Sequence, residues 1–257
     1  MIDEDGPLHG GTANRGRVIR IGNTVRRPRG PHSPAVHRLL RHLADTGFAG
    51  APQVIDSRPD TEILTFITGI AAYEPLPAWA LGDKALRSFA GLLRDYHDHV
   101  ETFSEDGLPW QRNVPTRWRG TLISHNDLNP ANVVFRDGHA VALIDFDLAG
   151  PGSRAWDLAV AACFWVPLCD KRHIHDSRRD TTFARYRLLL DAYHAGGTLR
   201  REVAEATIDA NKWISTIIAS GAGHGHPAFS AIWKASAQRY RGAQAWLAAN
   251  QRRLATL

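Results

Sequence analysis

The sequence is poor in the features that mark secreted and membrane-spanning proteins. Its 257 residues include only two cysteines, Cys163 and Cys169, without CxxC spacing, so we expect neither a disulfide framework nor a thiolate metal site. No apolar run reaches the ~18 residues that a membrane span needs. The acidic N-terminus, residues 1–5, lacks the apolar region of a secretory signal. These absences predict a cytoplasmic protein with no membrane partner.

The charge is basic overall but unevenly distributed. Lysine and arginine number 31 and aspartate and glutamate 26, which gives a net charge of +5 and a pI near 9.5. Residues 158–257 hold 14 basic and 7 acidic side chains, whereas residues 1–157 are net −2. The basic residues are dispersed, and no RNA-binding signature with interleaved aromatics occurs. We therefore expect solvated, arginine-rich helix faces and no nucleic-acid partner, with an anion-attracting surface as the alternative.

The first 70 residues have the order strand, strand, helix, strand. Residues 17–21 alternate partly between apolar and polar, and after a short turn the chain returns through 24–27. A helix follows, for which Ser33 is the expected N-cap and Gly47 the end. Residues 62–67 form the next predicted strand. This order predicts a small antiparallel sheet with one helix.

The remainder is predicted to be mainly helical apart from one hairpin. Asp137-Gly138, a strong hairpin signal, joins expected strands at 132–136 and 139–144. The expected helices span 83–100, 181–194, 199–220 and 228–255. A glycine-rich break at 221–227 separates the last two.

The densest polar signal is the segment 125–132, which reads His-Asn-Asp-Leu-Asn-Pro-Ala-Asn and is followed by Asp145. A two-residue hairpin turn pairs residues whose numbers sum to 275, so Asn132 is expected opposite Leu143 and Asp145 one diagonal step beyond. An amide and a carboxylate that meet there suit Mg²⁺ held jointly with phosphates.

The loop before the hairpin adds a third group. Asp127 lies within reach of the same point and can orient, or accept a proton from, a hydroxyl nucleophile, while His125 can brace the loop. Phosphoryl transfer depends mainly on positioning and charge neutralisation, and these are the parts it requires. An ordinary polar turn between buried strands is the alternative.

These residues resemble a known enzyme family. The stretches SHNDLNPANVVF and ALIDFD are similar to the H-x-D-x-x-x-x-N loop and metal-binding aspartate of kinase-like proteins, most of all aminoglycoside phosphotransferases and choline-kinase-like small-molecule kinases. Residues 156–159 resemble the family's "DLA" helix start, and 93–97 its "L..LH" helix. The resemblance implies an α+β, bilobal protein-kinase-like fold, with an antiparallel-sheet N-lobe at 1–69 and a mainly helical C-lobe at 70–257.

The resemblance also implies roles for individual side chains. Asp127 would be the catalytic base, and Asn132 and Asp145 would bind Mg²⁺. Asp147 would be a nearby carboxylate on the metal or substrate side. Asp157 would brace the catalytic loop by accepting hydrogen bonds, with a plain helix N-cap as the alternative.

Nucleotide contacts are implied in the first lobe. Gly11 and Thr12 lie in a Gly-Gly turn that resembles the family's turn over the nucleotide phosphates, with a simple turn as the alternative. Backbone groups near Phe66 and Ile67 are expected to form the hinge that meets adenine.

The sequence departs from the family at the phosphate-contacting lysine. An arginine would have to serve there, and Arg27 is favoured over Arg26 because it shares a strand face with Val25, which could lie under adenine. The helix that should supply a glutamate partner offers Val, His and Arg at 36–38 instead. The lysine–glutamate pair is therefore expected to be missing, which puts ATP affinity or activity in doubt.

The expected function is ATP- and Mg²⁺-dependent transfer of the γ-phosphoryl group to a hydroxyl of a small molecule. The net charge of +7 in residues 158–257 argues against a strongly polycationic acceptor such as a standard aminoglycoside. Trp156, Trp165, Trp213 and Trp233 are expected as core anchors, with an apolar substrate pocket as the alternative. A nucleotide-binding pseudokinase or regulatory protein is the other function considered. The chain is expected to be a monomer or homodimer.

Overall fold

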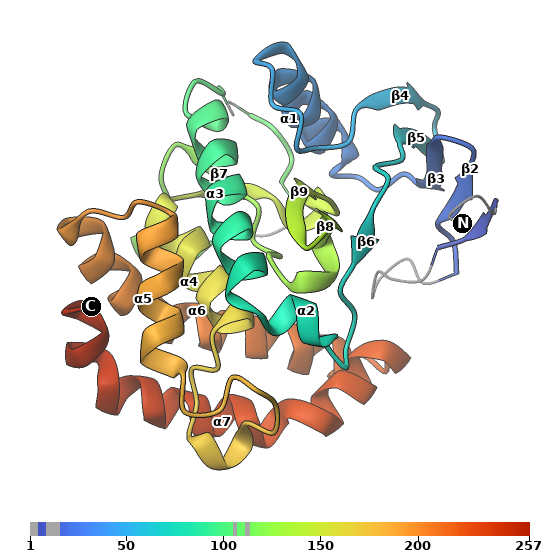
Figure 1. Cartoon of the computed structure of the whole chain (residues 1–257). Helices are drawn as coiled ribbons and strands as arrows, with labels where there is room; N and C mark the ends of the chain where they lie inside the picture. The colour runs from blue at the N-terminus through green and yellow to red at the C-terminus, as the bar shows by residue number, and fades with distance from the viewer. Residues whose placement is uncertain (1–4, 9–15, 105–106, 111–113) are drawn as a thin grey trace.

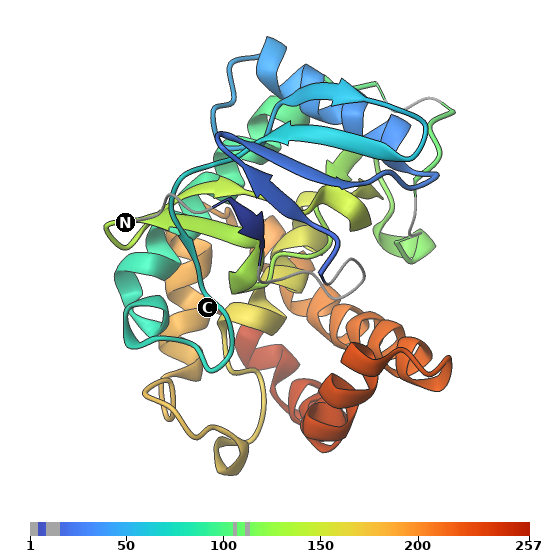
Figure 2. The same cartoon turned by 90° about the vertical axis from the view of Figure 1, so that its right-hand side faces the viewer.

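The computed structural model describes residues 5–8, 16–104, 107–110 and 114–257. A small antiparallel sheet with one helix packs beside a larger, mainly helical part (Figure 1). In the view of Figure 2 the sheet lies at the top, and the last two helices form an antiparallel pair at the lower right. This is the α+β, bilobal arrangement that the sequence predicts.

The sheet has five strands in the order β1-β2-β3-β5-β4, each antiparallel to its neighbours. Their bounds are Gly6–Pro7 (β1), Ile19–Ile21 (β2), Thr24–Pro28 (β3), Val54–Ser57 (β4) and Thr61–Thr65 (β5). The three predicted strands are present, with ends shifted by at most two residues. β1 and β4 were not predicted, because two and four residues are too short to show a periodic pattern.

The register of the sheet decides which side chains share a face. Arg27 of β3 lies directly opposite Glu62 of β5, and both are buried. Because alternate residues of a strand point to the same side, Arg27 and Val25 share that face, as predicted. Arg26 is exposed on the other face, paired with Ile63.

Helix α1 (Ser33–Asp45) follows β3. It buries the apolar stripe that its periodicity predicts, namely Val36, Leu39, Leu40 and Leu43. The predicted N-cap is wrong by one residue. His32 is the N-cap and already has helical dihedral angles, while the Ser33 hydroxyl accepts a hydrogen bond from the Gly30 N–H at 3.1 Å and so closes the turn before the helix.

A linker and a central helix lead into the second part. Strand β6 (Ile70–Ala71) and the short helix α2 (Ala78–Leu81) precede helix α3 (Asp83–Val100), whose bounds match the prediction. Phe89 of α3 stacks on Trp165 with ring centroids 4.2 Å apart. Both rings belong to the main hydrophobic core of the molecule.

The predicted hairpin is formed by β8 (Val133–Arg136) and β9 (His139–Leu143), and β6 extends it to a three-stranded sheet. Asp137 and Gly138 both have positive φ, 51° and 74°, as a tight two-residue hairpin turn requires.

The predicted pairing holds only near that turn. Arg136 pairs with His139, but the register shifts in the middle of the hairpin, so Val133 rather than Asn132 lies opposite Leu143. The N–H of Ile144 donates to the Asn132 carbonyl at 2.9 Å. The bulge thus moves Asn132 one residue closer to Asp145 than a regular two-residue hairpin would place it.

Short elements and four helices complete the fold. Strands β7 (Leu122–Ser124) and β10 (Gly150–Gly152) pair with each other. The 3₁₀ turns span Thr116–Trp118, Pro130–Asn132, Phe146–Leu148 and Lys171–His173. The helices are Arg154–Trp165 (α4), Thr182–Ala192 (α5), Gly197–Gly223 (α6) and Pro227–Ala255 (α7).

The predicted helix break at 221–227 is shorter than expected. Helix α6 continues through Gly221 and ends at Gly223. A Cβ atom on Gly221 would lie 2.4 Å from the Phe229 ring of α7. Gly221 therefore permits close packing of the two helices and does not end α6.

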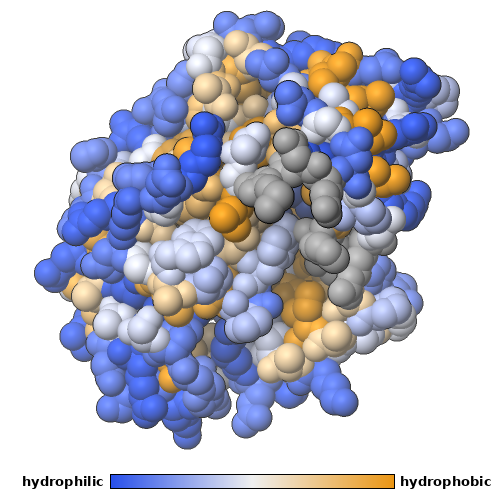
Figure 3. Space-filling view, turned by 45° about the vertical axis from the view of Figure 1, so that its right-hand side comes forward, coloured by the Kyte–Doolittle hydropathy of each residue, from blue (hydrophilic) through white to orange (hydrophobic). Residues whose placement is uncertain are grey.

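The surface is largely hydrophilic on the side seen in Figure 3, with apolar patches in the upper right. The exposed large hydrophobic side chains of the described residues include Ile19, Ile21 and Ile55 of the five-stranded sheet. Among the helices described, none is long and apolar enough to cross a membrane.

Candidate active site

The predicted catalytic loop follows β7 and leads into β8, and its own side chains hold Asp127. Asn129 Nδ2 donates to Asp127 Oδ1 at 2.8 Å, and Asn132 Nδ2 donates to Asp127 Oδ2 at 2.8 Å and to the Asp127 carbonyl at 2.9 Å. Both carboxylate oxygens are thereby fixed in direction while the side chain stays partly exposed. Asn129, which the sequence did not single out, also caps the 3₁₀ turn at 130–132.

His125 ties this loop to the end of the hairpin. Its Nε2 lies 3.0 Å from the Ile144 carbonyl, and its Nδ1 accepts the Asp127 N–H at 3.3 Å. A carbonyl accepts and a backbone N–H donates, so the ring is the neutral tautomer with its proton on Nε2. Burial lowers the pKa of His125, which favours this neutral form.

Asp157 lies in the first turn of α4 and accepts two backbone hydrogen bonds from the loop. The N–H of His125 donates to Oδ2 at 2.8 Å and the N–H of Asn126 donates to Oδ1 at 2.9 Å. The structure therefore gives Asp157 the contacts of a bracing residue. The alternative of a plain N-cap is wrong, because Ser153 is the N-cap of α4.

A buried chain of hydrogen bonds extends from Asp157 toward the surface. His97 Nε2 lies 3.1 Å from Asp157 Oδ2, and His97 Nδ1 lies 2.7 Å from the Tyr193 hydroxyl. Arg154 donates to the same hydroxyl at 3.1 Å. Because Asp157 accepts from Nε2, the Tyr193 hydroxyl donates to Nδ1 and accepts from Arg154. Asp157 is therefore fixed by a hydrogen-bond chain that runs through His97 of α3 and Tyr193, which follows α5, to Arg154 of α4.

Two tryptophans anchor the catalytic loop from the helical side. Trp156 Nε1 donates to Asn126 Oδ1 at 2.8 Å, and Trp165 Nε1 donates to the Leu128 carbonyl at 2.7 Å. Both rings are buried, so these two are core anchors and do not line a pocket. Trp213 packs edge-on against Trp156 with centroids 5.6 Å apart.

The predicted metal ligands lie at the open end of the hairpin. Asn132 uses its amide nitrogen on Asp127, which leaves Oδ1 as an available acceptor. Asp145 has a left-handed backbone conformation, φ 63°, directly after β9 and Ile144. Left-handed non-glycine residues are strained and concentrate at functional sites. Asn126, in the catalytic loop, has the same feature at φ 67°.

These groups fit a magnesium ion that is bound jointly with phosphates. Such ions take few protein ligands, mainly carboxylate and carbonyl oxygens, and complete their octahedron with phosphate and water. Asn132 and Asp145 supply that type of donor. Within the described ranges no group of three or more His, Cys, Asp or Glu side chains could hold a metal on its own.

Arg27 reaches this site from the sheet. Its Nη1 lies 3.3 Å from Asp145 Oδ1 and its Nη2 lies 2.7 Å from Asp147 Oδ1. The side chains of Asp145 and Asp147 keep 30% and 36% of their exposure, so ligands can reach them. The sequence-predicted residues Arg27, Asp145 and Asp147 therefore meet at one point between the sheet and the helical part.

The sequence did not predict the partner of Arg27. Arg27 Nε donates to Glu62 Oε1 at 2.5 Å, and Glu62 Oε2 lies 2.6 Å from Nε2 of His37 on α1. Helix α1 supplies no glutamate, as expected, but the cation does not lack a glutamate partner, because Glu62 of strand β5 takes that place. Pairing β3 with β5 in the observed register would have revealed it, since Glu62 is then directly opposite Arg27.

The site's electrostatics follow from burial and from three close carboxylates. Burial and the Asp147 charge raise the pKa of Asp145 to about 7, against the effect of Arg27. Burial also raises the pKa of Asp127, although hydrogen bonds from Asn129 and Asn132 oppose it. Burial alone would lower the pKa of Arg27, but the charges of its carboxylate partners raise it.

The other residues predicted to contact the nucleotide are Gly11, Thr12, Phe66 and Ile67. Gly11 and Thr12 lie outside the described residues. The N–H of Phe66 donates to the Asn23 carbonyl at 2.8 Å, so it is not available to a base, and the Phe66 ring lies 4.0 Å below the Arg20 guanidinium. Ile67 follows in the segment that links β5 to β6.

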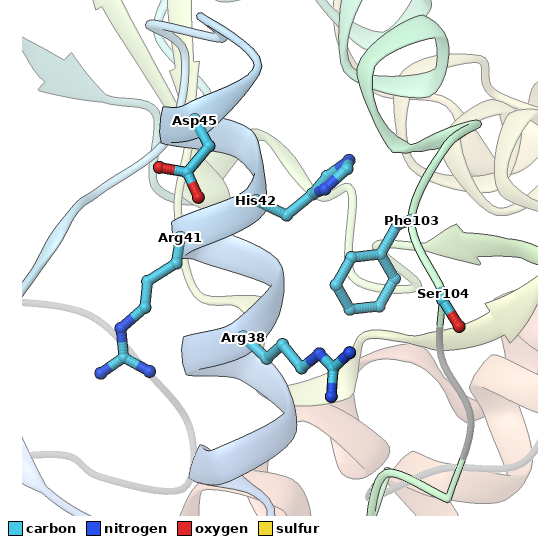
Figure 4. A pocket seen from close by; sticks show the side chains of 6 residues that line it. All are labelled: Arg38, Arg41, His42, Asp45, Phe103 and Ser104. Carbon is cyan, nitrogen blue, oxygen red and sulfur yellow. The ribbon is translucent and has the colours of Figure 1, made fainter.

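A separate hollow of about 270 Å³ lies between α1 and the residues after α3. Figure 4 shows Arg38 and His42 on the side of Phe103, whereas Arg41 and Asp45 lie on the other side of the helix. None of the predicted site residues lines this hollow. Its side chains diverge, so it does not assemble a reactive group.

Comparison with known proteins agrees with this geometry. Residues 105–203, which contain the catalytic loop, the β8–β9 hairpin and α4, match the phosphotransferase enzyme family. The predicted family resemblance is confirmed. The matched segment carries Asp127, Asn132 and Asp145, so the family motif and the converging side chains coincide.

Two curated proteins are similar in sequence to part of this chain. The chain is 37% identical to the trifolitoxin immunity protein of Rhizobium leguminosarum bv. trifolii over 162 residues, 59% of this chain and 58% of that protein. It is 31% identical to a homoserine kinase of Granulibacter bethesdensis over 148 residues, 53% of this chain and 46% of that protein. The chain thus spans about half the length of the curated relatives it matches.

The fold is shared more widely than the sequence. The GDP complex of an aminoglycoside 2′-phosphotransferase-IIIa matches with a TM-score of 0.61 over 97% of this chain and 94% of that chain, at 14% identity. At such low identity the likeness shows the fold, and it extends beyond the segment that matches the family.

Proposed function

We propose that the protein is an ATP- and Mg²⁺-dependent phosphotransferase that moves the γ-phosphoryl group to a hydroxyl of a small molecule. The observation that carries this proposal is that two contacting pairs of side chains, Asn132 with Asp127 and Arg27 with Asp145, lie on either side of the backbone hydrogen bond from Ile144 to Asn132. Asp127 and Asn132 come from the catalytic loop, Asp145 from the end of the hairpin, and Arg27 from the sheet. The homoserine kinase relative and the GDP-bound structural neighbour support a nucleotide-dependent reaction.

Asp127 acts on the acceptor. Its carboxylate accepts a hydrogen bond from the substrate hydroxyl, orients the oxygen for attack and takes the proton as the new bond forms. Asn129 and Asn132 keep both oxygens in place, so little reorganisation is required at the moment of transfer.

Charge neutralisation falls to the groups around the phosphates. Asn132 and Asp145 would hold Mg²⁺, which when bound neutralises phosphate charge. Arg27 carries a fixed positive charge whose forked donors match phosphate oxygens. We place the boundary between the nucleotide-binding lobe, 1–69, and the lobe at 70–257 after Gly69, because Ile70 already pairs with Phe135 of the hairpin sheet.

The acceptor is proposed to be neutral or anionic. Residues 158–257 hold an excess of basic side chains, and most of their acidic groups already have partners. Those pairs are Asp170–Arg172, Asp176–Arg178, Asp180–Lys171, Asp191–Arg200, Glu205–Arg117 and Asp209 with the indole N–H of Trp118. Few carboxylates remain to bind a polycation.

The alternative of a pseudokinase with little turnover was motivated by a missing ion pair. Arg27 and Glu62 form such a pair, so this motive no longer applies. Nucleotide binding without turnover of any acceptor in a broad panel would again favour the pseudokinase alternative.

The proposal is tested by following ADP release with a panel of hydroxylated metabolites and antibiotics, aminoglycosides included. We expect turnover of a neutral or anionic compound and a loss of about 10²–10⁴-fold in Asp127→Asn, because the general base is removed. Asp137→Asn, at the exposed hairpin turn, is the matched control and should retain full activity. Turnover that survives Asp127→Asn contradicts the assignment of the base, and a panel in which only aminoglycosides react contradicts the substrate class.

A further inference from the structure

Glu62 joins two elements within one buried cluster. Its Oε1 accepts from Arg27 Nε at 2.5 Å, and its Oε2 lies 2.6 Å from His37 Nε2. Glu62 is 1% exposed and His37 is 4% exposed. A buried carboxylate with a partner on each oxygen has no freedom to rotate without leaving a donor unsatisfied.

The hydrogen bond from Arg27 Nε to Glu62 fixes the orientation of the whole guanidinium group. Arginine carries its donors in a rigid plane, with Nε on one edge and the two Nη atoms toward the other. With Nε bound to Glu62, the Nη atoms face Asp145 and Asp147. A lysine ammonium is a single point and could not bind the sheet carboxylate and extend a fork to the opposite side.

We propose that Glu62 and His37 are positioning residues for Arg27 in nucleotide binding. Glu62 fixes the guanidinium so that its Nη edge meets the phosphates, and His37 secures Glu62 to α1. This inference rests on the proposed phosphotransferase function. It means that the carboxylate partner of the phosphate-binding cation comes from the neighbouring strand, while the helix contributes an imidazole.

The sheet register supports a positioning role over a merely structural one. Arg27 and Glu62 are directly opposite each other across β3 and β5, so the pairing of these two strands alone makes the two side chains neighbours. The pair with Glu62 uses only Nε of Arg27, and the two Nη atoms contact Asp145 and Asp147 at the proposed metal site. Arg26, the next residue, is exposed on the opposite face and has no such connection.

A double-mutant cycle tests this inference. The dissociation constant of a non-hydrolysable ATP analogue is measured with Mg²⁺ by calorimetry for the wild type, Glu62→Gln, Arg27→Met and the double variant. We expect Glu62→Gln to weaken binding by about tenfold in the wild type and to have no further effect in the Arg27→Met background, because Glu62 acts through Arg27. Arg27→Lys, which keeps the charge but loses the fork, should also weaken binding and be insensitive to Glu62→Gln.

The helix contact has its own pair of variants. His37→Ala should weaken binding several-fold, and His37→Gln, which keeps an N–H donor, should restore most of it. Arg26→Met is the matched control and should change binding by less than twofold. Thermal unfolding of each variant identifies any that do not fold.

The outcomes separate the inference from the function on which it rests. If Glu62→Gln has no effect, or weakens binding equally with and without Arg27, the positioning role is wrong although the wild type still binds and turns over. If the wild type binds no nucleotide with Mg²⁺, the proposed function falls and this inference falls with it.

Discussion

At the scale of single residues, Glu62 shows how a charge is kept inside the protein. Burial alone would raise the pKa of Glu62, but the hydrogen bond from His37 and the charge of Arg27 lower it from 4.5 to about 2. A carboxyl group whose pKa is lower in the folded state stabilises the fold above its unfolded pKa. That contribution is lost as the pH falls from about 4.5 through 2.

This shift predicts a pH-dependent cost of removing the charge. Glu62→Gln should lower the free energy of unfolding at pH 7 by about 2 kcal/mol, because a buried charged hydrogen-bond pair is replaced by a neutral one. The difference between variant and wild type should shrink as the pH falls below 4.5, since the wild type then loses the same term. Urea unfolding at pH 7 and pH 3 measures it.

The control for this prediction is Glu101→Gln. The Glu101 side chain is 72% exposed, so its removal should cost little at either pH. A difference for Glu62→Gln that is equal at pH 7 and pH 3 would contradict the lowered pKa.

At the scale of elements, the sequence predicted regular features and missed departures from regularity. The Asp137-Gly138 hairpin and helix α3 follow from local turn chemistry and 3.6-residue periodicity, so they were predictable. The bulge in β9 was not, because no residue type requires it and it changes pairing only in the middle of the hairpin. The Arg27–Glu62 pair needed knowledge of which distant strands are neighbours.

Gly221 illustrates the same limit for helices. Local propensity marks a glycine cluster as a break, yet α6 passes through Gly221 because Phe229 of α7 packs against its backbone. Gly221→Ala should therefore destabilise the protein by about 1–3 kcal/mol, since the new methyl group overlaps the base of the Phe229 side chain. Thermal or denaturant unfolding gives the value.

Gly223→Ala, two residues along the same helix, is the matched control. Nothing lies within 4 Å of a Cβ placed there, so the substitution should be neutral or slightly stabilising through helix propensity. Equal effects at both positions would show that Gly221 acts through backbone flexibility and not through its contact with Phe229.

At the scale of the whole molecule, the proposed ligand site draws on both parts of the fold. Arg27 belongs to the five-stranded sheet, whereas Asn132 and Asp145 flank the hairpin of the helical part. A ligand bound by both parts stabilises the folded state by about 2.7 kcal/mol at 100 times its dissociation constant. For a chain of this size that corresponds to a rise in Tm of roughly 5–10 °C.

The expected dependence on magnesium distinguishes joint binding of metal and nucleotide from binding of the nucleotide alone. Nucleotide and Mg²⁺ together should raise Tm more than either alone, because Asn132 and Asp145 are proposed to hold a metal that the phosphates share. Asp145→Asn should lose the effect of Mg²⁺ while retaining the smaller shift from nucleotide alone, which Arg27 supports. Without ligand the same variant should be as stable as the wild type or more so at pH 8, because burial and Asp147 already disfavour the Asp145 charge there. A variant that loses unliganded stability and keeps the magnesium effect would place the metal elsewhere and make Asp145 a structural residue.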